Sequence, residues 1–136
     1  MSRRCLILTE AGDGIGFGHL TRCSAILEQL NENHIGAPHE MLVNIDGDWH
    51  FDLENSRNID WRSKISNIIR MSRDFQLVLV DSYLADEAIF RTLRQAFEIS
   101  VAIDDFDRIS YEVDLVLCPS ASFKKVGYPA GVWHGR

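Results

Sequence analysis

Short apolar runs alternate along the chain with segments in which apolar residues recur every three or four positions. The apolar runs are typical of buried strands, and they cover residues 4–9, 40–45, 76–80, 99–103 and 114–117. The three-to-four spacing is typical of helices with one buried face, and it covers residues 19–33, 61–73 and 86–97. This alternation predicts an α/β fold built on a parallel, doubly wound sheet. Residues 49–58 follow neither period and receive no assignment.

Polar residues collect where the predicted strands end. They are His19 with the glycine loop before it, Asp46, Asp81–Tyr83 and Asp104–Asp105. In a doubly wound sheet, ligands bind beyond the carboxyl ends of the strands. We therefore expect these residues to meet at one edge of the sheet and to line a site.

The loop between the first predicted strand and the first predicted helix has glycine at positions 12, 14, 16 and 18 and ends at His19. The GxGxxG dinucleotide fingerprint fails, because Phe17 or His19 occupies its third glycine position. A Walker A motif fails as well, because the loop has no lysine. Free N–H groups at a helix start favour an anion, and a neutral imidazole there can act as a general base. The alternative is a tight turn in which His19 is only a polar cap.

Composition narrows the classes of function. The 136 residues suffice for one domain, and 14 Lys and Arg against 20 Asp and Glu give a net charge of −6, so we expect no nucleic-acid binding. The three cysteines form no CxxC pair, which predicts neither a disulfide framework nor a zinc site and favours the cytoplasm. No stretch reaches the roughly 20 apolar residues of a membrane span. No histidine or acidic cluster has ligand spacing, so we expect no metal.

Residues 14–23, GIGFGHLTRC, resemble the IGxGHxxRC signature of the UDP-sugar hydrolase of pseudaminic acid biosynthesis and of the related SpsG-type polysaccharide proteins. Three further segments follow in the family's order. Residues 80–83 (VDSY) resemble its VD-x-Y, residues 103–108 (IDDFDR) its IDD-x-x-R, and residues 114–117 (DLVL) its DLLL. The resemblance covers positions 3–120, and its first segment is the most specific.

The resemblance implies the N-terminal half of a two-domain, GT-B type protein, in which each half is Rossmann-like and the active site lies in the cleft between them. Residues 1–122 would then form the N-terminal domain, and residues 123–136 a tail or the start of an interdomain segment. The C-terminal nucleotide-binding domain is expected to be absent from this chain. A homodimer partner or a completing C-terminal domain would close the cleft into which His19 faces.

The resemblance also implies roles for individual residues. His19 matches the histidine that activates the attacking water or acceptor hydroxyl, and Tyr83 matches the tyrosine beside the sugar. The glycines that admit the sugar and its diphosphate correspond to Gly14, Gly16 and Gly18. Arg22 matches the signature arginine, for which a substrate contact and a structural ion pair are equally consistent.

Three aspartates are further candidates. Asp81 orients His19 or a sugar hydroxyl, or it caps the following loop, and the sequence leaves these roles open. Asp104 is a candidate substrate contact. Asp104 and Asp105 are neighbours in an extended segment and point to opposite faces, so at most one of them faces the cleft easily.

The function implied is a nucleotide-sugar hydrolase or an inverting glycosyltransferase that acts on a UDP- or CMP-linked sugar in the synthesis of surface polysaccharide or nonulosonic acid. The family implies no cofactor. The alternative is a module that binds a sugar or a nucleotide sugar without catalysis.

Overall fold

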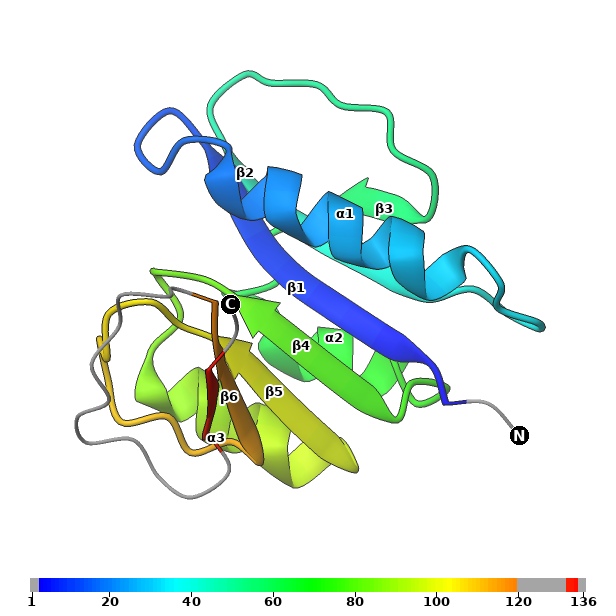
Figure 1. Ribbon diagram of the computed structural model, residues 1–136. Helices are drawn as coiled ribbons and strands as arrows, with labels where there is room; N and C mark the ends of the chain where they lie inside the picture. The colour runs from blue at the N-terminus through cyan, green and yellow to red at the C-terminus, as the bar shows by residue number, and fades with distance from the viewer. Residues whose placement is uncertain (1–2, 120–131, 135–136) are drawn as a thin grey trace.

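Seven strands form one sheet in the computed structural model, which describes residues 3–119 and 132–134 (Figure 1). The order across the sheet is β3-β2-β1-β4-β5-β6-β7, and every neighbouring pair is parallel. The strands are β1 (Cys5–Gly12), β2 (Glu40–Asp46), β3 (Ser56–Asn58), β4 (Leu77–Asp81), β5 (Ile99–Ile103), β6 (Leu115–Cys118) and β7 (Val132–His134). β2 and β3 follow on one side of β1, and β4 to β7 follow on the other side. This reversal of direction confirms the predicted doubly wound α/β fold.

Helices cover both faces of the sheet, with α1 (Gly18–Asn31) on one face and α2 (Ile65–Met71) and α3 (Glu87–Ala96) on the other (Figure 1). The ends of α1 and α3 lie within two residues of their predicted bounds. α2 is shorter than the predicted helix over 61–73. Trp61 is fully buried and its indole N–H donates to the carbonyl of Thr9 at 2.7 Å, which fixes residues 61–64 as a turn before the helix. No helix of the described residues is long and apolar enough to cross a membrane.

The predicted elements omit two strands. β3 has the polar sequence Ser-Arg-Asn and pairs with β2 at an edge of the sheet, so it carries no apolar signal. β7 pairs with β6, so the sheet continues beyond the domain boundary expected at residue 122. The rest of the expected tail, residues 123–131 and 135–136, lies outside the described residues.

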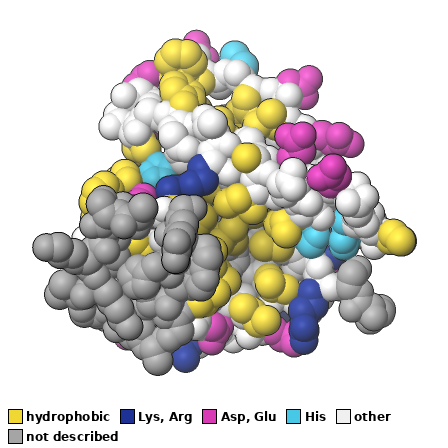
Figure 2. Space-filling view, in the orientation of Figure 1, with side chains coloured by type: hydrophobic (Ala, Val, Ile, Leu, Met, Phe, Trp, Pro, Cys, Tyr) yellow, Lys and Arg dark blue, Asp and Glu magenta, His cyan; other side chains and the backbone are white. Residues whose placement is uncertain are grey.

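The sheet separates two hydrophobic cores, one beneath α1 and one beneath α2 and α3. Side chains of a strand point alternately to the two faces. Asp81 therefore lies on the α1 face, two residues after Leu79, and Glu10 lies on the α2–α3 face, two residues after Leu8. Among the described residues α1 is the only helix on its face, and hydrophobic side chains stay exposed on this face (Figure 2). Leu30 of α1, for example, is 38% exposed.

Candidate active site

The loops that follow β1, β2, β4 and β5 lie together at the carboxyl edge of the sheet, as expected from the polar strand ends. The glycine loop after β1 is tied to the turn after β2. The N–H of Asp13 donates to the carbonyl of Asp46 at 3.0 Å, and the indole N–H of Trp49 donates to the Asp13 carboxylate at 2.6 Å. Gly12 permits this contact, because its φ is +134° and a Cβ there would lie 2.0 Å from the Asp46 carbonyl oxygen.

His19 and Arg22, in the first turns of α1, both bind the carboxylate of Asp81 at the end of β4. Nδ1 of His19 lies 2.8 Å from Oδ1 of Asp81. Nε and Nη2 of Arg22 donate to the two oxygens of the same carboxylate at 2.8 Å each, and Nη1 donates to Asp105 at 3.2 Å. Asp81 therefore orients the imidazole, and Arg22 forms an ion pair within the protein.

Asp81 is ionised at neutral pH in spite of its burial. Burial raises the pKa of this carboxyl, but the hydrogen bonds and charges of His19 and Arg22 outweigh that effect and hold the pKa below its ordinary value of 3.8. An ionised carboxylate accepts a hydrogen bond from Nδ1–H, so this tautomer of the imidazole has its lone pair on Nε2. No described residue donates to or accepts from Nε2, so this nitrogen is available to a hydrogen-bond donor.

The imidazole does not stand at an open mouth, and the sequence-based expectation is wrong on this point. The side chain of His19 is only 5% exposed, because the ring of Tyr83 covers it edge-to-face with 4.2 Å between ring centroids. β4 ends at Asp81, so the turn that follows carries Tyr83 across the first turn of α1. A molecule that reaches Nε2 must pass or displace the phenol ring, which is itself 38% exposed.

Space remains open beside the start of α1. A Cβ at Gly18 would meet no atom within 4 Å, and one at Gly14 would come no closer than 3.5 Å to Oδ2 of Asp46. Gly16 also has open space around it, and its φ of +84° favours glycine. Phe17 at the N-cap supplies no capping side chain, and the first turn contains no acidic residue, so its N–H groups have no anion from their own helix.

Asp104 is buried away from the open space beside α1, where a contact with the substrate was predicted for it. It is 2% exposed, and its two oxygens accept hydrogen bonds from the hydroxyl of Tyr111 at 2.8 Å and from the N–H of Asp107 at 2.6 Å. Asp105 points to the opposite face, as the extended backbone led us to expect. Its partner there is Arg22, which the sequence did not predict. Asp104 therefore holds the turn after β5 and does not face the open space.

Sequence reasoning missed several residues at this edge. Glu10 is completely buried, and in the sequence it is only an interruption of an apolar run. Phe17 and Trp49 are exposed aromatic neighbours with 5.0 Å between ring centroids, and Phe106 lies 5.8 Å from the ring of Tyr83. Exposed aromatic residues after strand ends were a signal that could have singled out this rim.

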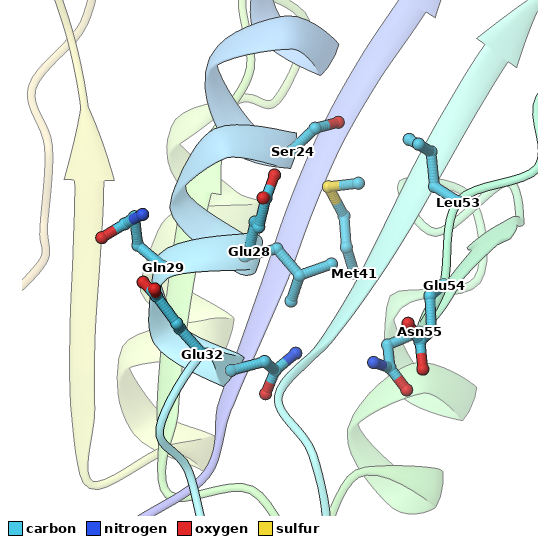
Figure 3. Close-up of a pocket in the computed structure, with 10 residues that line it drawn as sticks. Ser24, Glu28, Gln29, Glu32, Met41, Leu53, Glu54 and Asn55 are labelled. Carbon is cyan, nitrogen blue, oxygen red and sulfur yellow. The ribbon is translucent and has the colours of Figure 1, made fainter.

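A separate cavity of about 500 Å³ lies between the C-terminal half of α1 and residues 53–55 (Figure 3). Leu27 and Met41 line it together with the carboxylates of Glu28, Glu32 and Glu54. None of its ten lining residues is a predicted site residue. The cavity is therefore separate from the site around His19, which lies at the N-terminal end of the same helix.

Comparison with known proteins assigns no family to the chain: no family model and no curated protein matches it. Within residues 3–119, no group of three or more His, Cys, Asp or Glu side chains is arranged to hold a metal ion.

Proposed function

We propose that this chain is the N-terminal half of a nucleotide-sugar hydrolase or inverting glycosyltransferase, with His19 as its general base. The observation that carries the proposal is the imidazole at the start of α1, bound through Nδ1 to a buried, ionised Asp81 and with no described partner on Nε2. The four-segment resemblance to the pseudaminic acid hydrolase and SpsG-type proteins supplies the substrate class. The substrate proposed is a UDP- or CMP-linked sugar used in the cytoplasm for surface polysaccharide or nonulosonic acid.

In the proposed reaction, Nε2 of His19 takes a proton from water or from an acceptor hydroxyl as that oxygen attacks the anomeric carbon. The bond between the anomeric carbon and the phosphate oxygen of the nucleotide breaks, and UDP or CMP leaves with the bonding electrons. Asp81 stabilises the imidazolium that forms, as the carboxylate of a His–Asp pair does. The N–H groups of the first turn of α1 favour the phosphate charge by about 0.3–1 kcal/mol, up to about 2 kcal/mol where the site is partly buried.

A completing lobe is part of the proposal. It would be the C-terminal nucleotide-binding domain or a second copy of this chain, seated over the carboxyl edge of the sheet. In the closed cleft, a substrate would reach Nε2 of His19 past the ring of Tyr83.

The test uses the complete gene product with a panel of UDP- and CMP-linked amino sugars and measures the free nucleotide released. Release without an acceptor identifies a hydrolase, and release that requires a sugar acceptor identifies a transferase. His19→Asn should lower turnover by at least about 100-fold, the usual scale for a lost general base. The matched control is His50→Asn, because the side chain of His50 is 94% exposed and lies in the loop after β2. An unchanged rate in His19→Asn would remove His19 from the mechanism.

The second candidate is a module that binds a sugar or nucleotide sugar without catalysis. The observation that favours it is the 5% exposure of His19, because a buried imidazole between Asp81 and Tyr83 also serves as a structural link. This candidate predicts ligand binding by calorimetry with no nucleotide release by the complete gene product. It also predicts that His19→Asn changes stability and leaves ligand affinity within about twofold.

A further inference from the structure

A fully buried carboxylate, that of Glu10, lies at the end of β1 on the face opposite Asp81. We infer that Glu10 is a positioning residue that sets Tyr83 against His19 by holding the backbone of the turn after β4. The catalytic consequence of this inference rests on the proposed function, whereas the positioning itself does not.

The carboxylate of Glu10 binds three donors of one turn. Oε2 accepts the backbone N–H of Tyr83 at 2.7 Å and that of Leu84 at 3.2 Å. Oε1 accepts the hydroxyl of Ser82 at 2.5 Å, and the Ser82 oxygen in turn accepts the N–H of Ala85 at 2.9 Å. Glu10 therefore fixes the backbone on both sides of the Tyr83 Cα.

A second group holds the same turn through its carbonyls. Nη2 of Arg108 donates to the carbonyl of Ala85 at 2.6 Å and to that of Ser82 at 3.2 Å. The turn is thus bound through its N–H groups by a carboxylate from β1 and through its carbonyls by a guanidinium that follows β5. The phenol ring of Tyr83 therefore extends from a turn whose backbone is hydrogen-bonded on both sides of this residue.

The choice of a carboxylate at position 10 runs against the pattern of its strand. Leu6 and Leu8 precede it on the same face, so a further apolar side chain would continue the core. A buried carboxylate is costly unless it is paired and hydrogen-bonded, and the positive charge near it is Arg62, with Nε 3.6 Å from Oε1. A glutamate here is better explained by the turn that it binds than by the stability of the core.

Two carboxylates on neighbouring strands therefore set the two rings of the site. Asp81 reaches His19 from the α1 face, and Glu10 reaches the backbone of Tyr83 from the α2–α3 face. β1 and β4 are paired in register, with Thr9 opposite Asp81, so the two carboxylates come from adjacent levels of the sheet. The 4.2 Å contact between the rings follows from this arrangement.

The substitutions Glu10→Ala and Glu10→Gln separate positioning from bulk stability. Alanine leaves the N–H of Tyr83 without its acceptor and leaves the N–H of Leu84 only the hydroxyl oxygen of Ser82, at 3.1 Å. Glutamine keeps one oxygen for the N–H groups of Tyr83 and Leu84 and loses only the bond from the Ser82 hydroxyl, so it should rescue the position of Tyr83. The matched control is Glu112→Ala, because Glu112 is a half-buried glutamate whose carboxylate pairs with Arg91 of α3.

The direct measurement is the NMR chemical shift of the His19 ring protons, which the ring current of Tyr83 displaces; Tyr83→Leu defines the undisplaced value. We expect Glu10→Ala to lose the displacement, and Glu10→Gln and Glu112→Ala to keep it. A full displacement in Glu10→Ala would overturn the inference whether or not the protein turns over a substrate. Should Glu10→Ala not fold, Glu10→Leu takes its place, because leucine continues the apolar face of Leu6 and Leu8 and offers the turn no acceptor. An unchanged His19 displacement in that variant would overturn the inference equally.

In the complete gene product, Glu10→Ala should lower kcat by about 10-fold or more with a smaller change in KM, and Glu10→Gln should restore most of it. A loss of the His19 displacement with no turnover by any version of the protein would refute the proposed function and leave the positioning role standing. Equal kcat values per folded molecule for Glu10→Ala and wild type would refute the catalytic consequence of the positioning.

Discussion

Asp81→Asn tests the candidate site through a single lost charge. The substitution keeps the shape of the side chain and removes the negative charge shared by His19 and Arg22. Removing one partner of a buried ion pair costs about 3–5 kcal/mol. We expect the lower end, about 3 kcal/mol, because Arg22 is 30% exposed and keeps Asp105 as a partner. For a chain of 136 residues this loss lowers Tm by roughly 10 °C.

Urea unfolding of both proteins across a pH series measures the effect. The pKa of Asp81 is depressed in the folded protein, so its contribution is present above the ordinary value of 3.8 and is lost as the pH falls through the folded value. The gap between wild type and Asp81→Asn should shrink as the pH falls below about 4. A loss under about 1 kcal/mol at pH 7, or a gap that does not shrink in acid, would refute this reasoning.

The remaining predictions concern two glycines and a histidine. Gly18→Ala should raise stability by about 0.5 kcal/mol, because the position is helical with open space beyond it, and it should weaken binding of a UDP-linked sugar in calorimetry. Gly12→Ala should instead cost more than about 1 kcal/mol in urea unfolding, because its Cβ would collide with the turn after β2 at a positive φ. Nδ1 of His39 accepts the N–H of Cys5 at 2.9 Å, and burial together with nearby positive charge lowers the pKa of His39. Wild-type stability should therefore fall as the pH drops below 6.5, and His39→Asn, which keeps an acceptor, should remove that part of the fall; an equal slope in both proteins would contradict it.

The sequence predicts those features of the site that depend on periodicity. The apolar runs and the helical stripes place His19 and Asp81 at the same edge of the sheet, and a spacing of three residues puts Arg22 near His19 on α1. The predicted sheet lacks β3 because an exposed edge strand of three polar residues has no pattern to detect.

The remaining features depend on tertiary contacts that no local pattern encodes. Tyr83 covers His19 because the turn after β4 is held from β1, 72 positions or more away along the chain. Glu10 appears in the sequence as a polar break in a strand, and only the fold shows that its oxygens face the donors of that turn. Asp81 is the last residue of β4, whereas Asp104 comes one residue after the end of β5. The alternation of side chains therefore points Asp104 to the opposite face, where it accepts the hydroxyl of Tyr111.

The hydrogen bonds between the glycine loop and the turn after β2 have a consequence for protein engineering. Trp49 binds Asp13, and a Cβ at Gly47 would lie 2.3 Å from the Asp13 carboxylate. Trp49 and Asp13 lie 36 positions apart in the sequence, but their hydrogen bond joins the two segments into one unit. A graft of residues 12–18 onto another doubly wound scaffold should therefore fail unless residues 46–49 are transplanted with it.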